Sequence, residues 1–158
     1  MKRTAIITVL FICLFTALSP AREMSGVPSF IRTPQDLAAW LADEFEYRME
    51  IPDRWQDVSE TISSRQGDCE DFAVLSSVVL QNLGISNDVV IVEFRDLKIS
   101  HALCVWEDTD GTYSFISNKK IYYSGETELA RAVQKFYPDW CKMVFTDHRK
   151  NPLKTVKR

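Results

Sequence analysis

The stretch Arg65-Gln66-Gly67-Asp68-Cys69-Glu70-Asp71-Phe72-Ala73 decides how the middle of this chain folds. Gly67 interrupts the segment before it, and Asp68 is a residue type that commonly caps the first turn of a helix. Gly84 lies where a left-handed residue ends a helix. Apolar side chains recur between them at helical spacing: Phe72, Leu75, Val79, Leu80 and Leu83. The pattern predicts a helix that begins at Cys69.

The sequence after this helix changes to a pattern typical of strands. Asp110-Gly111 marks a hairpin turn within it. Strands are predicted at 89–92, 101–106, 112–116, 121–123 and 140–145, with a helix at 127–137. On the N-terminal side, Thr33 as a cap and Pro34 in the first turn predict a helix over 34–49, and a shorter helix is expected over 57–64. Together these elements indicate one α+β domain.

The first 21 residues have the order of a signal peptide. Lys2 and Arg3 precede an uncharged run from 5 to 18, and small residues follow at Ser19 and Ala21. The run is too short to cross a bilayer comfortably, since a spanning helix needs about 20 apolar residues. We expect cleavage after Ala21 and a periplasmic or secreted protein with no membrane attachment afterwards; an uncleaved N-terminal anchor is the alternative.

The predicted mature domain spans residues 22–148 and is acidic overall. Removal of 1–21 leaves 17 basic and 22 acidic residues, a formal net charge of −5. A negative charge of this size gives no support for a nucleic-acid partner. The last segment, 149–158, is basic and lacks apolar periodicity, so it is predicted to be a flexible tail.

Cys69 is the candidate nucleophile because of its position in the first turn of a helix. The positive end of a helix dipole favours a thiolate, and exposed backbone amides there can receive an oxyanion. The flanking acids Asp68, Glu70 and Asp71 act in the opposite sense. A cationic partner is therefore needed, and His101, at the start of a predicted strand, is the best placed to form an ion pair with the thiolate.

A helix-borne cysteine followed by a strand-borne histidine resembles the transglutaminase-like superfamily. The segment from Arg65 to Ala73 is similar to that superfamily's cysteine motif, and His101-Ala102 to its histidine motif. The Gly-Asp-Cys-Glu-Asp form is most similar to bacterial transglutaminase-like cysteine peptidases, whose best-known members are periplasmic proteases. The resemblance implies a papain-like α+β domain in which the cysteine-bearing helix packs on an antiparallel sheet.

The resemblance also implies a third active-site residue on the strand after the histidine. In the family this residue is usually an aspartate, and hairpin alignment places Ser117 there. Serine can hold an imidazole by a hydrogen bond but cannot offset its charge. Asn118 is the preferred candidate, if a bulge or register shift turns it inward, as asparagine serves in Cys-His-Asn sites.

Some periplasmic relatives bind calcium through acids that flank the cysteine. In this chain the corresponding residues are Asp68, Glu70 and Asp71, and carboxylate oxygens suit calcium. Three acids at a helix start are more often a solvated cap that interacts with the helix dipole. No cofactor is expected to be required, and calcium remains a possibility that the resemblance raises.

The remaining cysteines admit two readings. Cys104 and Cys141 could form a disulfide if their strands are neighbours, or both could be unpaired core thiols. Either reading leaves Cys69 as a free thiol.

The predicted function is an exported thiol-dependent hydrolase, a cysteine peptidase that acts on a protein or peptide through an acyl-enzyme. Two alternatives remain open: a catalytically inactive transglutaminase-like binding module, and an acyltransferase that uses an amine in place of water.

Overall fold

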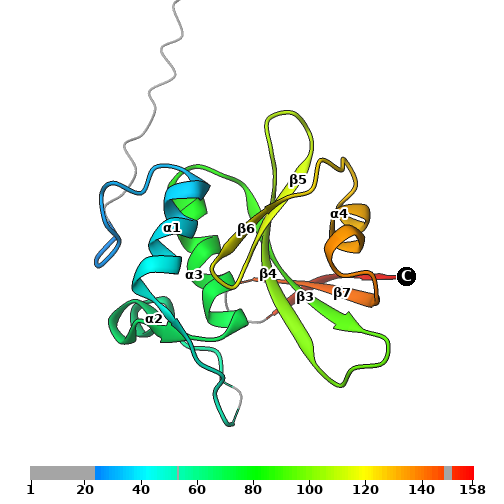
Figure 1. Cartoon of the computed structure of the whole chain (residues 1–158), viewed down its shortest axis with the longest axis horizontal. Coiled ribbons are helices and arrows are strands. Elements are labelled where there is room, and N and C mark those ends of the chain that lie inside the picture. The colour runs from blue at the N-terminus through cyan, green and yellow to red at the C-terminus, as the bar shows by residue number, and fades with distance from the viewer. Residues whose placement is uncertain (1–23, 53, 148–150) are drawn as a thin grey trace, which may run out of the picture.

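An antiparallel sheet forms the centre of the protein (Figure 1). The computed structural model describes residues 24–52, 54–147 and 151–158. The predicted signal segment lies outside these residues. Among the residues described, no helix is long and apolar enough to cross a membrane.

The sheet has six strands in the order β6-β5-β4-β3-β7-β8, and every neighbouring pair is antiparallel. Their bounds are Asn87–Phe94 (β3), Ser100–Glu107 (β4), Tyr113–Ser117 (β5), Lys120–Tyr123 (β6), Trp140–Thr146 (β7) and Pro152–Lys157 (β8). Two short segments, Glu46–Tyr47 (β1) and Gln66–Gly67 (β2), pair in parallel apart from this sheet. The architecture confirms the predicted α+β class.

Helices cover both faces of the sheet (Figure 1). Three lie on one side and α4 on the other, and their bounds are Pro34–Glu44 (α1), Val58–Ser64 (α2), Cys69–Asn82 (α3) and Leu129–Phe136 (α4). Successive side chains of β4 point to opposite faces of the sheet and so contribute to both cores. Cys104 and Trp106 belong to the core with α1 and α3, whereas Leu103 and Val105 belong to the core with α4.

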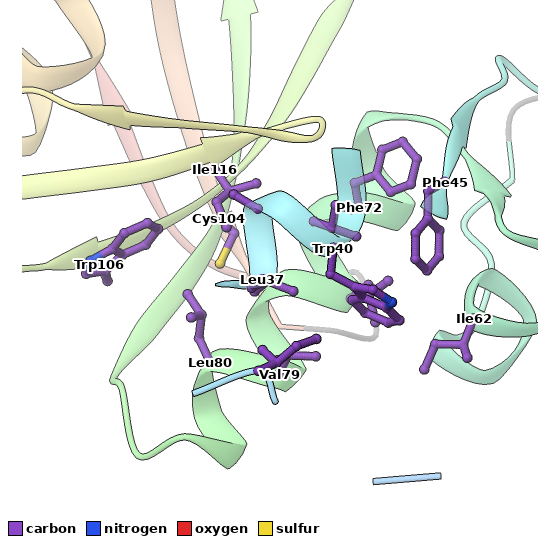
Figure 2. Close-up of a cluster of buried hydrophobic side chains, with 14 residues drawn as sticks. Leu37, Trp40, Phe45, Ile62, Phe72, Val79, Leu80, Cys104, Trp106 and Ile116 are labelled. Atoms are coloured by element: carbon purple, nitrogen blue, oxygen red, sulfur yellow. The ribbon is translucent and has the colours of Figure 1, made fainter. Parts of the chain in front are cut away.

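The larger core holds α3 between α1 and the sheet. Phe72 from α3 is completely buried and lies with Leu37 and Trp40 from α1 (Figure 2). The predicted apolar stripe of α3 faces this core, and Gly84 follows the helix with φ of 80°, as its assignment as a left-handed terminator requires. The packing fixes the position of α3, and therefore of its first residue, Cys69.

The predicted helix over 34–49 is shorter in the structure and ends at Glu44. Phe45 is extended, and its ring packs edge-on against Trp40 at 4.8 Å and Phe72 at 6.1 Å. The burial of this ring turns the chain out of the helix, and the next two residues pair with β2. The segment 46–49 therefore runs alongside the start of α3.

The prediction of a flexible basic tail over 149–158 is wrong for 152–157. These residues form β8, an edge strand paired with β7 from Lys142↔Lys157 to Thr146↔Pro152. The sequence gives little indication of this strand, because only Val156 is partly buried, where it packs against the core beneath α4. Backbone hydrogen bonds to β7 hold a strand whose side chains are mostly polar.

The three described cysteines, Cys69, Cys104 and Cys141, are all free. Cys104 lies on β4 and Cys141 on β7, and β3 separates these two strands in the sheet. The disulfide considered above required neighbouring strands, so the reading with two unpaired thiols is the correct one.

Candidate active site

A capping box at the start of α3 holds Cys69 in place. The Asp68 side chain accepts a hydrogen bond from the Glu70 amide at 3.2 Å. In return, Asp71 Oδ2 accepts from the Asp68 amide at 3.1 Å, and Asp71 Oδ1 accepts from the buried Gln56 amide at 2.7 Å. This exchange satisfies amides that a helix start would otherwise leave unpaired. Asp68 and Asp71 therefore cap the helix as predicted, but all three acids beside Cys69 are buried, so the expectation of a solvated helix start is wrong.

Gly67 permits this close packing. A Cβ at this position would lie 2.8 Å from the Cβ of Asp71 and 2.9 Å from its Oδ2. Only a residue without a side chain lets the Asp71 carboxylate reach back over the turn. The glycine that the sequence pattern uses to separate two helices also makes room for the cap.

The thiol of Cys69 is mostly buried and protonated at rest. Its Sγ donates to Glu70 Oε2 at 2.9 Å. Burial raises the pKa of Cys69 first, and the hydrogen bond to Glu70 raises it further, while a hydrogen bond from the Ala102 amide lowers it. The dipole of α3 does not overcome these effects, so the activated thiolate expected from helix position is not the resting state.

His101 lies at the start of β4, next to the residue whose amide reaches Cys69. Its Nε2 is 2.7 Å from the hydroxyl of Ser117 on β5. Burial lowers the pKa of His101 below its usual 6.5, so the imidazole is neutral at pH 7. The expected thiolate–imidazolium ion pair is replaced at rest by a neutral thiol and a neutral imidazole.

One cavity of about 680 Å³ contains both groups. Cys69, His101, Ser117 and Asn118 all line it. The four residues predicted from the sequence come from three separate places in the chain and lie around one cavity. Ser117 holds Nε2, so Nδ1 is the ring nitrogen outside this hydrogen bond.

The two candidates for the third residue differ in their contacts. Ser117 makes the hydrogen bond to His101, as hairpin alignment predicts. Asn118 has φ of 52°, and its buried Oδ1 has no hydrogen-bond partner among the described residues. Ser117 therefore occupies the third position in this structure, and a role for Asn118 in orienting His101 stays a prediction.

Two further contacts escaped the sequence analysis. The hydroxyl of Tyr137 lies 2.7 Å from Ser117 Oγ, and the Glu70 carboxylate accepts from the Cys69 thiol. The sequence places Tyr137 only at the end of a helix, 20 residues from Ser117. No local sequence pattern predicts a contact between residues that far apart.

The carboxylates of Asp68 and Glu70 form a group with the Cys69 sulfur, with their ligand atoms within 4.8 Å of one another. Burial, followed by the hydrogen bond and charge of Glu70, raises the pKa of Asp68 to about 6. Asp71, the third acid predicted as a calcium ligand, is outside this group, and both of its oxygens accept backbone hydrogen bonds.

Residues 27–135 match the transglutaminase-like domain family, and the chain belongs to that family. Comparison with curated proteins gave no match. Among solved structures, calcium-bound LapG of Legionella pneumophila is similar with 17% identity and a TM-score of 0.51, over 78% of this chain and 63% of LapG. EGTA-treated LapG is similar with 18% identity and a TM-score of 0.50, over 78% and 61%.

These comparisons confirm the family and the transglutaminase-like fold that the cysteine and histidine motifs predicted. The chain spans less than two thirds of the length of LapG. At this identity the likeness concerns the fold alone, and the chemistry rests on the residues of this chain.

Proposed function

We propose that this protein is an exported cysteine hydrolase that cleaves amide bonds of a protein or peptide through an acyl-enzyme. The observation that supports the proposal is the placement of Cys69 and His101 around one cavity, with His101 held through Nε2 by Ser117. A thiol, an imidazole and a group that orients the imidazole are the parts of a cysteine nucleophile site.

The neutral resting pair determines the order of events. His101 Nδ1 takes the proton from Cys69 as Sγ attacks the substrate carbonyl, so the imidazolium forms together with the new C–S bond and the negative charge appears on the carbonyl oxygen. The imidazolium then gives this proton to the leaving amine. Water, deprotonated by the same nitrogen, attacks the thioester and releases the acid and the free thiol.

The start of α3 offers a place for the oxyanion formed in both steps. The Glu70 and Asp71 amides already donate to the Asp68 side chain, so the Cys69 amide, at the positive end of the helix dipole, is the donor assigned to the oxyanion. Developing negative charge on the carbonyl oxygen is stabilised by donors fixed in this way. The capping box at Asp68 and Asp71 gives the turn its rigidity.

An inactive binding module is the second candidate, and a specific observation favours it. Ser117 stands where the family usually has a carboxylate, and burial and Glu70 raise the pKa of the Cys69 thiol. Both features weaken a nucleophile.

An acylation experiment separates the candidates. The full chain is mixed with p-nitrophenyl acetate, and its intact mass and the released nitrophenolate are followed. A hydrolase gives an acetyl adduct on Cys69 that then decays, and Cys69→Ala abolishes it while Cys141→Ala does not. A wild-type chain that reacts no faster than Cys69→Ala would refute the hydrolase. Addition of a primary amine identifies an acyltransferase, because the product is then the amide.

Calcium is proposed as a ligand of this site through Asp68 and Glu70, whose oxygens suit the ion and whose close approach leaves negative charge to be balanced. A bound ion would supply positive charge beside the thiol. The solved LapG structures include a calcium-bound form, which is a property of that protein. Calcium should raise the melting temperature of the wild type, and EGTA should reverse the rise. An equal rise in Asp68→Asn would contradict this site.

Export is proposed on the signal-like order of residues 1–21. N-terminal sequencing of the protein from the native cell should give a chain that begins at Arg22. A chain that retains its first 21 residues would favour the uncleaved anchor.

A further inference from the structure

The hydroxyl of Ser117 is held between two other groups. His101 Nε2 lies 2.7 Å from Ser117 Oγ on one side, and the Tyr137 hydroxyl lies 2.7 Å from it on the other. Both distances are those of good hydrogen bonds. The three side chains come from β4, β5 and the residue that follows α4, so tertiary packing assembles the chain His101–Ser117–Tyr137.

Packing fixes the position of Tyr137. Its ring lies 5.7 Å from the ring of His101, 6.0 Å from Phe94 and 6.2 Å from Phe115. Its backbone amide donates to Val133 in the last turn of α4 at 2.8 Å. The hydroxyl is therefore delivered to Ser117 by a ring with little freedom to move.

Proton counting shows what the tyrosine contributes. An imidazolium carries hydrogens on both ring nitrogens, so Nε2–H of protonated His101 must donate to Ser117 Oγ. Ser117 then has to turn its own hydrogen to another acceptor. The Tyr137 oxygen is in position to accept it, and burial raises the pKa of Tyr137, which keeps the phenol neutral.

Without that acceptor, Ser117 is free to donate its hydrogen to Nε2. This reversed hydrogen bond favours the tautomer with the proton on Nδ1, the nitrogen that the reaction needs as a base. A chain of hydrogen bonds with one direction also polarises its members and strengthens them. A Tyr137 hydroxyl that accepts from Ser117 therefore favours the orientation of the serine that leaves Nδ1 as the base.

We propose that Tyr137 is a positioning residue that orients Ser117, and through it His101, in the place of the carboxylate that this chain lacks. The inference rests on the proposed hydrolase, since it assigns Nδ1 of His101 as the base. Tyr137 acts in this proposal through Ser117, to which its hydroxyl is hydrogen-bonded.

A double-mutant cycle tests the coupling. Tyr137→Phe removes only the hydroxyl and should slow acylation of Cys69 by p-nitrophenyl acetate about threefold to tenfold, the worth of one hydrogen bond. In a Ser117→Ala background the same change should have no further effect, because the link is already missing. Equal losses in both backgrounds, or no loss in either, would overturn the proposal.

Tyr123→Phe is the matched control. Tyr123 also uses its hydroxyl in one side-chain hydrogen bond, accepting from Gln35 Nε2 at 2.6 Å, but it lies outside the cavity. This variant should acylate at the wild-type rate. Melting curves of all variants identify any loss of fold.

Nitrogen NMR of His101 separates failure of this inference from failure of the proposed function. The ring nitrogens report which tautomer is present whether or not the protein is an enzyme. Tyr137→Phe should lower the ratio of Nε2–H to Nδ1–H tautomers by at least about threefold. An unchanged or raised ratio overturns the role of Tyr137 even if Cys69 is acylated, and a lowered ratio upholds it even if no acyl-enzyme forms.

Discussion

Replacement of Asp71 by asparagine tests the capping box that holds Cys69. Asp71 is buried and accepts two backbone hydrogen bonds, from Asp68 at 3.1 Å and from Gln56 at 2.7 Å. An asparagine side chain has the same shape but only one acceptor oxygen. Its amino group would face the other backbone N–H, so one buried donor would lose its partner.

The size of the effect follows from these contacts. A hydrogen bond to a charged group contributes about 1.5–3 kcal/mol, and a buried donor left unsatisfied costs about 1–3 kcal/mol. Burial, the largest effect, raises the pKa of Asp71, so desolvation of the carboxylate offsets part of this contribution. We therefore expect Asp71→Asn to lower the free energy of unfolding by about 1.5–2 kcal/mol, in the lower half of these ranges.

The chain contains a matched control at the start of α1. Asp36 occupies the same position of a capping box and also accepts two backbone hydrogen bonds, from Arg32 and Thr33, but both go to Oδ2 and the residue is only half-buried. Urea unfolding should show a clearly smaller loss of unfolding free energy for Asp36→Asn than for Asp71→Asn, because a single amide oxygen can keep both hydrogen bonds. Equal losses in the two variants would refute the need for two acceptor oxygens at Asp71.

Three further predictions concern the site. Because burial lowers the pKa of His101, its contribution to stability is present above pH 6.5 and is lost as the pH falls. Between pH 7.5 and pH 5.5, the free energy of unfolding measured in urea should therefore decrease more for the wild type than for His101→Gln. Both proteins keep Asp68, whose raised pKa of about 6 changes stability with pH in the opposite direction, so its effect cancels when the two are compared. Ser117→Asp should raise the pKa of His101, measured by NMR, by about one unit or more, because a carboxylate stabilises the imidazolium. An unchanged pKa would show that His101 Nε2 does not face residue 117. Gly67→Ala should destabilise the protein by about 1–3 kcal/mol in urea, because its methyl group would overlap Asp71; an unaffected variant would contradict the close packing.

The sequence predicts those parts of the fold that rest on local signals. The two ends of α3 could be predicted from Asp68 and Gly84, because capping residues act on the helix turn directly beside them. The end of α1 was predicted too late because Phe45 leaves the helix to pack on Phe72, a contact made 27 residues further along the chain. Strand β8 was missed because its stability comes from backbone pairing with β7 and hardly from apolar side chains.

The same distinction applies to the site. The placement of Cys69, His101, Ser117 and Asn118 around one cavity could be predicted from their motifs and the hairpin, whereas their roles, and the choice of Asn118 as third residue, stay predictions. The protonation state could not, because the pKa of Cys69 depends first on burial and then on the orientation of the Glu70 side chain. Tyr137 could not be predicted either, because tertiary packing brings it to Ser117.

The reaction of iodoacetamide with Cys69 tests most directly whether His101 serves this thiol. Both Cys69 and the half-buried Cys141 are free, so peptide mass spectrometry can follow their labelling rates in one sample. His101→Ala should slow the labelling of Cys69 by at least about tenfold, since its thiol proton loses its acceptor, and should leave Cys141 unchanged. Equal labelling of Cys69 with and without His101 would contradict a shared proton between the two groups.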